Sequence, residues 1–374
     1  MKKVCHVTSG YFRDNARNFQ RQCKSLHRAG YDVCVLTNDG QPDEVLDGIK
    51  IYNCKRFWKN RIKVLLFAKW QFFQKAVEIN ADIYQLHSPE LLFIAIKLKK
   101  LGKIVVYDAH EDLPTHILEK DWLPLWSRKL VSSIFSIYMN HVFNQIDEII
   151  SPVNHVVQKI NKKFGKGILI ANFPILKNQY NVTDDNYKTR ENIFCYSGTV
   201  YSYSNQEVIA GALLSVSGAH YHVAGYIDEV QQSILLHSGA SNRIKLFGRL
   251  NQIELTKFYH DSIAGIVIYD YKKNVGYKRG SYGTNKIFEY MEAGLPIICT
   301  DFDLWKDIVD RYQCGICIKP GDKEGLVQAM RTIMNNKKAS YIMGRNGRRA
   351  VEEEFNWGSE ELKYYKLFSE LSRK

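Results

Sequence analysis

Segments that favour β-strands alternate with segments that favour α-helices along nearly the whole chain. The first unit is a strand at 3–8, a helix at 15–29 that ends near Gly30, and a strand at 32–37. A helix between consecutive strands is the usual connection between parallel strands, so the pattern predicts parallel sheets with helices on both faces. No period of roughly 20–50 residues repeats, which argues against a solenoid. The predicted fold class is therefore α/β, with doubly wound, Rossmann-like sheets.

The length of the chain indicates more than one domain. It has 374 residues, and single hydrophobic cores stop growing beyond about 250–300 residues. Residues 175–191 are polar and lack periodicity, so we predict a linker there between an N-terminal domain, 1–174, and a C-terminal domain, 192–357. The remaining expected strands of the two domains are 49–54, 82–86, 103–108, 148–151 and 167–171, then 192–197, 222–225, 243–247, 265–269, 296–300 and 315–319.

Composition narrows the classes of partner. The formal net charge is +13, which favours phosphorylated substrates, anionic lipids or nucleic acid. No recognised nucleic-acid-binding motif is present, so nucleic acid is not expected as a partner. The eight cysteines lie mostly in strand-like runs and suit a reducing compartment. Because no signal peptide and no run of about 20 apolar residues is found, we expect a cytoplasmic protein.

The stretch at 281–300 carries the strongest functional pattern. It begins Ser281-Tyr-Gly-Thr-Asn-Lys-Ile-Phe-Glu-Tyr-Met and ends in an apolar strand. A helix that begins just after Gly283 and Thr284 presents unpaired backbone N–H groups and the positive end of its dipole, which suit a phosphate. Lys286 adds a positive charge in the first turn, and the carboxylate of Glu289, one turn later, is placed to accept hydrogen bonds from a ribose. The pattern predicts a site for a nucleoside diphosphate that carries a further group.

This stretch resembles the nucleotide-sugar site of the GT-B glycosyltransferases of group 1, a retaining, family 4-like group with many members in bacterial surface-polysaccharide synthesis. The resemblance covers nearly the whole chain and is most specific at Asn285-Lys-Ile-Phe-Glu-Tyr-Met. It implies two Rossmann-like domains that face each other across a cleft, with a C-terminal helix at 358–374 returning to the N-terminal domain. The family often has two glutamates separated by seven residues. Here Glu289 is the second, but Ser281 stands in the first position.

A second motif, Tyr107-Asp-Ala-His-Glu-Asp112, follows a predicted strand. It resembles an Asp-x-His-Glu-Asp segment of the same family, in which the histidine lies beside the donor sugar. The resemblance therefore implies a catalytic role for His110, together with Lys286 and Glu289. A neutral imidazole can hydrogen-bond a sugar hydroxyl or stabilise charge in the transition state. The donor-binding residues predicted for the second domain are Gly198, Thr199, Arg249, Ser281, Gly283, Thr284, Asn285, Lys286 and Glu289.

The acceptor side is predicted in the first domain. The loop after the first strand offers Gly10, where a ligand can approach the backbone closely, and the cations Arg13 and Arg17 for an acceptor phosphate. Asp14 is the expected N-cap of the helix that follows. His87 and Glu111 complete the predicted acceptor-binding residues. Asp301 and Asp303 have the spacing of an Asp-x-Asp metal motif, but such motifs belong to a different transferase fold, so no metal and no cofactor is expected.

The resulting hypothesis is a glycosyltransferase that moves a sugar from a nucleotide-sugar to a lipid-linked or saccharide acceptor in bacterial polysaccharide synthesis, with retention of configuration. An epimerase or an inverting transferase of the same fold, or a non-catalytic nucleotide-sugar-binding subunit, remains an alternative. Basic, aromatic stretches at 56–63 and 122–130 lead into apolar helices. They suit either an anionic membrane surface or packing on a sheet with the cations extended into solvent, and they make the inner face of the cytoplasmic membrane an expected location.

Overall fold

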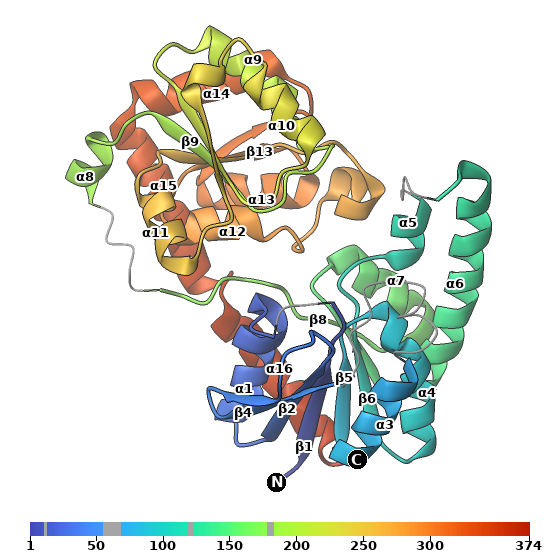
Figure 1. Cartoon of the computed structure of the whole chain (residues 1–374). Helices are drawn as coiled ribbons and strands as arrows, with labels where there is room; N and C mark the ends of the chain where they lie inside the picture. Colours follow the sequence, from blue (N-terminus) through green and yellow to red (C-terminus); the bar gives the residue numbers. More distant parts are fainter. Residues whose placement is uncertain (11–12, 55–68, 119–122, 178–182) are drawn as a thin grey trace. The chain divides into compact units, whose positions relative to one another are not determined.

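The computed structural model describes residues 1–10, 13–54, 69–118, 123–177 and 183–374. Two compact units divide the chain (Figure 1). Unit 1 comprises Met1–Asn172 and Gly358–Lys374, and unit 2 comprises Phe173–Trp357. The segment 175–191 that we predicted as a linker belongs to unit 2, where its described part contains a short helix, α8 (Asp184–Lys188).

Unit 1 contains a sheet of eight strands within the described residues, in the order β3-β4-β2-β1-β5-β6-β7-β8. Only β3 runs antiparallel to its neighbour, and it is the one strand of this sheet that the sequence pattern did not predict. Strands β1 to β4 lie on one side of the sheet, with β3 at the edge, and β5 to β8 follow one another outward on the other side, so the strand order reverses between β1 and β5. The strands are β1 (Lys3–Val7), β2 (Asp32–Thr37), β3 (Glu44–Leu46), β4 (Ile49–Asn53), β5 (Ile83–Leu86), β6 (Ile104–Asp108), β7 (Glu148–Ser151) and β8 (Gly167–Leu169).

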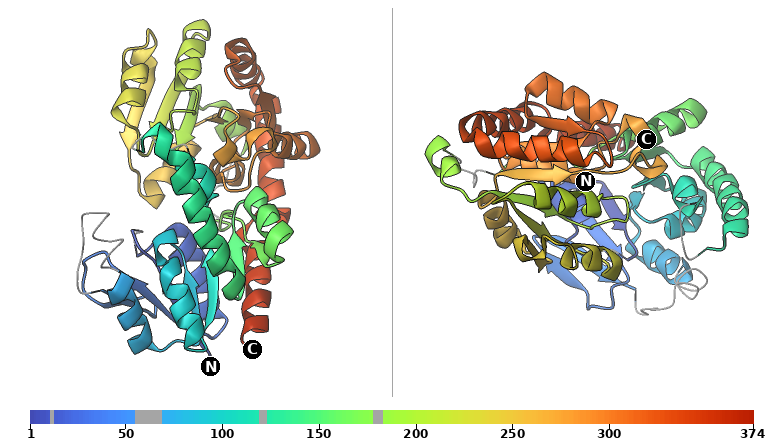
Figure 2. Two further views of the ribbon diagram at one scale, coloured as in Figure 1. Left: turned by 90° about the vertical axis from the view of Figure 1, so that its right-hand side faces the viewer. Right: turned by 90° about the horizontal axis from the view of Figure 1, so that it is seen from above.

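The helices of unit 1 cover both faces of this sheet, and the C-terminal helix α16, red in Figure 1, returns to it. Tyr364 of α16 donates a hydrogen bond from its hydroxyl to Gln85 of β5, across 279 residues of sequence. The left view of Figure 2 brings α6 to the front, and this helix packs on α4 and α5. The helices are η1 (Ala16–Cys23), α1 (Lys24–Arg28), α3 (Lys69–Ile79), η3 (Pro89–Leu91), α4 (Leu92–Lys100), α5 (Leu113–Leu118), α6 (Leu125–Gln145), α7 (Asn154–Phe164) and α16 (Trp357–Leu371).

The N-cap of the first helix lies one residue later than predicted. The side chain of Asn15, not Asp14, accepts hydrogen bonds from the backbone N–H groups of Arg17 and Asn18, so Asn15 is the N-cap. The helix starts as the π-helix η1 and becomes α-helical at Lys24. This wider turn is uncommon in proteins and often accompanies functional sites. It carries Arg17 and Gln22, both of which reach the polar cluster described below.

Unit 2 contains a parallel sheet, with six strands in the described residues in the order β11-β10-β9-β12-β13-β14. Its order reverses between β9 and β12, the position at which open parallel sheets bind ligands beyond the carboxyl ends of their strands. Both units are thus doubly wound α/β sheets, which confirms the predicted fold class. The strands are β9 (Ile193–Ser197), β10 (His220–Ala224), β11 (Ile244–Gly248), β12 (Ala264–Val267), β13 (Ile297–Thr300) and β14 (Gly315–Ile318).

The core of unit 2 is rich in large aromatic side chains. Trp305 and the tyrosines at 196, 259, 269 and 290 are almost completely buried. The tyrosine hydroxyls are satisfied by hydrogen bonds; that of Tyr290, for example, accepts from the backbone N–H of Ser197 at 2.9 Å. Besides α8, the helices of this unit are α9 (Gln206–Ser215), α10 (Glu229–Leu236), η4 (Ser241–Arg243), α11 (Gln252–His260), η5 (Lys273–Val275), η6 (Tyr277–Arg279), α12 (Asn285–Glu292), α13 (Asp303–Tyr312), α14 (Lys323–Asn335) and α15 (Lys337–Glu353).

Among the residues that the structure describes, no helix combines the length and the apolar character that crossing a membrane requires. The stretch at 56–63, which we considered for membrane contact, lies outside the described residues.

Close packing of α15 on α12 and the turn after it gives a direct test of the unit 2 core. A Cβ atom at Gly344 would lie 2.0 Å from the carbonyl oxygen of Gly294, which is backbone and cannot rotate away. We expect Gly344→Ala to destabilise unit 2 by about 1–3 kcal/mol, as overpacking does. The matched control is Gly211→Ala in α9, where the nearest atom lies at 3.6 Å, and which should be neutral or stabilising by up to about 1 kcal/mol. Thermal unfolding of both variants measures the difference; equal melting temperatures would contradict this packing.

Candidate functional site

A cavity of about 260 Å³ opens in unit 2 where strands β9, β10 and β11 end. Its walls come from these strand ends, from the loop into α11 and from the first turns of α12. The lining residues are Ser197, Gly198, Ala224, Gly225, Arg249, Leu250, Leu255, Asn285, Lys286 and Glu289. Five of the nine predicted donor-binding residues, Gly198, Arg249, Asn285, Lys286 and Glu289, are therefore brought together in one cavity, although they come from three separate parts of the sequence.

Glycines with positive φ end the three strands that border this cavity. Gly198, Gly225 and Gly248 have φ values of 108°, 123° and 65°, a region that side chains with a Cβ rarely adopt. Backbone hydrogen bonds join the three strand ends: the N–H of Gly198 donates to the carbonyl oxygen of Ala224, and the N–H of Gly225 donates to that of Gly248. A Cβ atom at Gly225 would lie 2.2 Å from the carbonyl oxygen of Gly198. Glycine at position 225 therefore allows the ends of β9 and β10 to pack closely, and Gly198 and Gly225 line the cavity with backbone alone.

Lys286 supplies positive charge at the wall of the cavity. Its Nζ lies 5.1 Å, 5.7 Å and 5.9 Å from the ring centroids of Tyr196, Tyr201 and Tyr269, within cation–π range of all three. On the other side, its Nζ lies 3.1 Å from the position that a Cβ at Gly198 would occupy. Aromatic faces thus hold the ammonium group against the bare backbone at the end of β9 and leave its hydrogen-bonding capacity for an anion.

The N-terminus of α12 adds backbone donors. Thr284 is the N-cap residue, but its side chain makes no capping hydrogen bond to the helix. The N–H groups of the first turn therefore lack the usual side-chain acceptor, and the helix dipole places partial positive charge there. The Oδ1 of Asn285 is buried and has no hydrogen-bond partner within the described part of the chain. The start of α12 therefore offers backbone N–H groups and the Oδ1 of Asn285 to which a polar ligand can hydrogen-bond.

Glu289, one turn along α12, carries the acidic group of the cavity. It accepts a hydrogen bond from the hydroxyl of Tyr259 at 3.1 Å, and this hydroxyl also lies 2.7 Å from Oγ of Ser197. Burial, and then the nearby Glu289 carboxylate, raise the pKa of Tyr259 well above its ordinary value, so the phenol stays protonated and donates. A neutral, fixed phenol positions the Glu289 carboxylate to accept hydroxyl hydrogen bonds from a ligand.

The other predicted donor-binding residues lie outside the lining of this cavity. Ser281 is buried: its Oγ accepts from the N–H of Gly283 at 2.9 Å, and its carbonyl oxygen accepts from Nε1 of Trp305 at 3.1 Å. Ser281 therefore stabilises the turn that leads into α12. We had predicted instead that its side chain contacts the donor. The carbonyl oxygen of Thr199 accepts from Tyr196 at 2.7 Å. Gly283 and Thr284 contribute their backbone to the turn before the helix.

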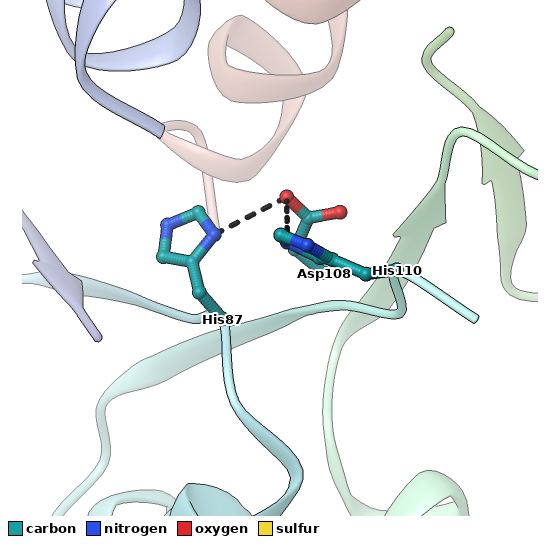
Figure 3. Close-up of side chains that lie close together, drawn as sticks. All are labelled: His87, Asp108 and His110. Atoms are coloured by element: carbon teal, nitrogen blue, oxygen red, sulfur yellow. Dashed lines mark hydrogen bonds and ion pairs between the residues drawn. The ribbon is translucent and has the colours of Figure 1, made fainter. Parts of the chain in front are cut away.

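A second polar cluster lies in unit 1, at the carboxyl ends of β5 and β6. Figure 3 shows His87 and His110 converging on the carboxylate of Asp108. Nδ1 of His87 lies 3.2 Å from Oδ2 of Asp108, and Nε2 of His110 lies 3.3 Å from the same oxygen. The side chains of His87 and Asp108 are fully buried, whereas 22% of the His110 side chain is exposed. His110 is therefore the member of this cluster that a ligand can touch.

Arg17 neutralises the buried carboxylate. Its Nη2 and Nε donate to Oδ1 and Oδ2 of Asp108 at 2.7 Å and 2.8 Å, a bidentate pair, and Gln22 donates to Oδ2 at 3.0 Å. Burial alone raises the pKa of Asp108, but the charge of Arg17 and the hydrogen bonds from the histidines outweigh burial, so the pKa lies well below its ordinary value. Asp108 is therefore an ionised anchor beneath His110.

This arrangement assigns the protons on the buried histidines. An ionised carboxylate only accepts hydrogen bonds, so Nδ1 of His87 donates to Asp108. Burial lowers the pKa of His87, which keeps the ring neutral and makes its Nε2 an acceptor. This Nε2 lies 2.9 Å from Nδ1 of His6, which must then donate. The assignment leaves Nε2 of His6 as a bare acceptor, and that buried atom indeed has no partner among the described residues.

His87, Asp108 and His110 also form the one group of potential metal ligands found in the described residues, with donor atoms within 4.8 Å of one another. Both oxygens of Asp108 already accept from the guanidinium of Arg17, and His87 is tied to His6. A divalent cation would have to displace or face this guanidinium charge. The donor set thus fits an arginine-neutralised carboxylate better than a metal site.

The acceptor-binding residues predicted for unit 1 divide into buried and exposed groups. Arg13 forms ion pairs with Asp39 and Glu44, both at 2.6 Å, and Arg17 is held by Asp108. Both guanidinium groups are therefore paired with carboxylates of unit 1. We had predicted instead that they contact an acceptor phosphate. His87 has no exposed side chain with which to line a pocket. Gly10 is exposed, and the exposed Glu111 pairs with His116 at 2.6 Å.

Several residues that shape these sites were not singled out from the sequence. In unit 2 they are the tyrosines around Lys286, together with Gly225. In unit 1 they are His6, Gln22 and the pairing of Arg17 with Asp108. A weak signal was present, because Tyr196, Gly225 and His6 all lie in strands or at their ends, and polar or aromatic groups there reach the carboxyl edge of a parallel sheet.

The buried histidines predict a pH dependence of stability in unit 1. Burial lowers the pKa of His6 and His87 below the ordinary value of 6.5. When the pH falls below 6.5, these histidines bind protons in the unfolded chain but stay neutral in the folded state. The free energy of unfolding therefore falls as the pH drops, by at most about 1.4 kcal/mol per pH unit for each histidine. We expect His6→Gln, which keeps a donor toward His87 but cannot titrate, to make this loss smaller. Amide hydrogen exchange of β1 and β5 at neutral and mildly acidic pH measures it, with the exposed His237→Gln as control. An unchanged slope in His6→Gln would contradict a lowered pKa of His6 in the folded state.

Comparisons with known proteins agree with this architecture. The structure of sucrose-phosphate synthase from Thermosynechococcus elongatus superposes with a TM-score of 0.76 at 15% identity, covering 100% of both chains. HepE from Anabaena, in complex with UDP-glucose, gives a TM-score of 0.72 at 14% identity over 99% of this chain and 100% of the other. WaaG, a glycosyltransferase involved in lipopolysaccharide biosynthesis, gives 0.70 at 12% identity over 96% and 98%. At such identities the similarity establishes the fold, which is GT-B.

Two family models match the sequence, one in each half. Residues 16–170 match the model described as glycosyltransferase family 4, and residues 181–350 match the one described as glycosyl transferases group 1. The first match spans η1 to the end of β8, and the second contains every residue that lines the unit 2 cavity. A search of curated proteins gave no match. Taken together, the two family models and the fold identify the protein as a GT-B glycosyltransferase.

Proposed function

We propose that the protein transfers a sugar from a nucleoside diphosphate sugar to a lipid-linked or saccharide acceptor in bacterial polysaccharide synthesis, such as that of O-antigen, capsule or exopolysaccharide. We further propose that the anomeric configuration is retained and that no metal ion takes part. The observation that carries the proposal is the cavity of unit 2, in which Lys286, the start of α12 and bare glycine backbone converge.

The cavity suits a diphosphate for three physical reasons. The ammonium group of Lys286 is fixed by aromatic faces, which contribute no competing carboxylate. The first-turn N–H groups of α12 lack a side-chain cap, so a phosphate oxygen can accept their hydrogen bonds. Gly198 and Gly225 line the cavity with backbone alone, so no side chain of theirs stands between a phosphate and the strand ends. Glu289 lies one turn away, at a distance along the helix that suits the hydroxyls of the attached ribose.

The same groups serve the reaction. In the transfer, the bond between the anomeric carbon and the diphosphate oxygen breaks, a bond to the acceptor oxygen forms, and the acceptor hydroxyl loses its proton. Negative charge grows on the departing diphosphate, and Lys286 with the positive end of α12 stabilises it, as preorganised donors do at developing anions. This role of a fixed cation is the reason for proposing that no divalent ion is needed. From unit 1, we assign to His110 the contact with the donor sugar that the family resemblance implies.

Structural neighbours support the choice of substrates. HepE was crystallised with UDP-glucose, and WaaG takes part in lipopolysaccharide biosynthesis. A nucleotide-sugar donor and a surface-polysaccharide acceptor are therefore the classes to test first. The place of Ser281 in the turn before α12 leaves the sugar contact of the missing glutamate to other groups of the site. A nucleotide-sugar epimerase, an inverting transferase or a non-catalytic binding subunit would each give a different outcome in the experiments below.

The donor site is tested by a thermal-shift screen of UDP-, GDP-, ADP- and dTDP-sugars, because a ligand that binds the folded state raises the melting temperature. For the sugar that gives the largest shift, we expect Lys286→Ala to weaken donor binding by about 10- to 100-fold, since a hydrogen bond to a charged group contributes roughly 1.5–3 kcal/mol. Lys257→Ala, which removes an exposed lysine of unit 2 that does not line the cavity, is the control. Wild-type affinity in Lys286→Ala would show that the diphosphate is held elsewhere.

The stereochemistry is tested by NMR of the product. We expect the newly formed glycosidic bond to have the anomeric configuration of the donor, measured from the anomeric proton coupling in a reaction with the best donor and a soluble saccharide acceptor. An inverted anomer would replace the proposal by an inverting transferase. Conversion of the donor sugar into its epimer without transfer would identify an epimerase. Donor binding with neither reaction, across acceptors of the proposed class, would favour a binding subunit.

A further inference from the structure

Two cysteines lie side by side in the sheet of unit 2. Cys299 of β13 and Cys317 of β14 are register partners in parallel strands, so their side chains lie on the same face of the sheet. Their Sγ atoms are 3.8 Å apart. Neighbouring strands lie about 4.8 Å apart, and the Cα atoms of a disulfide lie about 4.4–6.8 Å apart. The two sulfur atoms can therefore be joined without a change in strand pairing.

The two thiols differ in their access to solvent. Cys299 is fully buried, whereas Cys317 is partly exposed on β14, the edge strand of the sheet. Cys317 also lines a cavity of about 480 Å³ at this edge. Charged side chains of both signs line the same cavity; they are Asp301, Lys306, Lys319 and Asp322. A small polar oxidant that enters the cavity therefore meets Cys317 first.

Unit 1 contains a cysteine pair with the same strand register but without this access. Cys5 of β1 and Cys34 of β2 are register partners in parallel strands. Their exposed fractions are 0% and 1%, so solvent reaches neither thiol. The feature that distinguishes the pair in unit 2 is therefore the exposure of Cys317, and the pair in unit 1 is a matched control within the same chain.

We propose that Cys299 and Cys317 are an oxidation site, at which a peroxide forms a disulfide between β13 and β14 and thereby weakens donor binding in unit 2. In the first step, the sulfur of Cys317 attacks an oxygen of the peroxide and the O–O bond breaks. Cys317 becomes a sulfenic acid, and the departing oxygen takes the thiol proton and leaves as water or an alcohol. In the second step, the sulfur of Cys299 attacks the sulfenic sulfur. The S–S bond forms, and the hydroxyl group leaves as water with the proton of Cys299. Two electrons pass from the thiols to the peroxide.

The order of these steps follows from the surroundings of the two thiols. The hydrogen bond with Cys317, and then burial, raise the pKa of Cys299 well above its ordinary value, so Cys299 is held as a protonated thiol. It lies beside the sulfur that the oxidant reaches, which is the position needed to react with a sulfenic acid. In the reducing compartment that the cysteines suit, the dithiol is the resting form, and disulfides there are usually transient.

Hydrogen bonds connect this site to Lys286. Thr300 follows Cys299 in β13, and its Oγ1 accepts from the backbone N–H of Tyr269 at 2.7 Å and donates to the carbonyl oxygen of Tyr269 at 3.0 Å. The ring of Tyr269 is one of the three that surround Lys286.

An S–S bond of about 2.05 Å requires the sulfur atoms to approach each other from 3.8 Å, which displaces β13 beside Thr300. We expect this displacement to move Tyr269 relative to Lys286 and to lower the affinity for a diphosphate. This consequence rests on the proposed role of Lys286 in donor binding, whereas formation of the disulfide does not.

The disulfide is tested by treating the reduced full chain with hydrogen peroxide, unfolding it, alkylating the remaining thiols and mapping the peptides by mass spectrometry. We expect a peptide pair that is joined through Cys299 and Cys317 and has lost two hydrogen atoms, whereas Cys5 and Cys34 are recovered as alkylated thiols. Cys317→Ser should not form the bond. Cys314→Ala, which removes the cysteine three residues before Cys317, should still form it.

The effect on unit 2 is measured in two ways. The affinity for the best nucleotide-sugar of the thermal-shift screen should fall about fivefold or more on oxidation and recover with dithiothreitol. In Cys317→Ser, peroxide should leave this affinity unchanged, which controls for oxidation elsewhere. Amide hydrogen exchange at Tyr269 needs no donor, and it should become faster in the oxidised protein because the hydrogen bond to Thr300 is disturbed.

Three results would overturn the inference. The first is a chain in which peroxide leaves Cys299 and Cys317 reduced, or joins one of them to Cys314. The second is oxidation of Cys5 and Cys34 at the same rate, which would show that access does not select the site. The third is an oxidised protein with the donor affinity and the Tyr269 exchange of the reduced protein. A chain that binds no nucleotide-sugar would refute the proposed function, while the peptide map and the exchange at Tyr269 would still decide this inference. Melting temperatures show whether each variant is folded.

Discussion

The parallel arrangement of the strands is the constraint on which both sites depend. Parallel strands end at the same edge of a sheet, so residues that follow different strands become neighbours there, whatever their distance in sequence. In unit 1 this edge gathers His87 after β5 with Asp108 and His110 at the end of β6. In unit 2 it gathers the glycines that end β9, β10 and β11 beside the first turns of α12. The helices that enter from each edge complete the two sites.

Each unit places a charged side chain at this edge of its sheet, but only in unit 1 is that charge paired with an opposite charge. Asp108 is sealed from solvent, and Arg17, Gln22 and two histidines satisfy its oxygens, so its charge is balanced within unit 1. Lys286 is held by aromatic faces, which attract a cation without neutralising it. The first arrangement fixes the position of a neighbouring imidazole, and the second keeps a positive charge ready for a ligand. This difference is why the anion is assigned to unit 2.

The sequence predicted the sites unevenly, and the reason is the range of the interactions. The start of α12 after Thr284, the exposure of Lys286 to a cavity and the position of Glu289 one turn later follow from helix geometry over a few residues, and they were anticipated. Arg17 and Asp108 are 91 residues apart, and His6 and His87 are 81 apart. No local pattern encodes these partners. Arg17 and Arg13 therefore looked like free cations for an acceptor, although the fold places a carboxylate against each of them.

What the sequence by itself determined is the alternation of strand and helix, the two doubly wound sheets and the start of a helix just after Thr284. Periodicity, glycine positions and helix termini are local properties, so the chain carries them before it folds. Only the tertiary structure decided that Ser281 is enclosed in a turn, that three tyrosines surround Lys286, and that α6 buries one face and leaves the other to solvent. Burial and pairing depend on which segments the sheets bring together. A side chain acquires its charge partner, its pKa and its exposure only when that packing is complete.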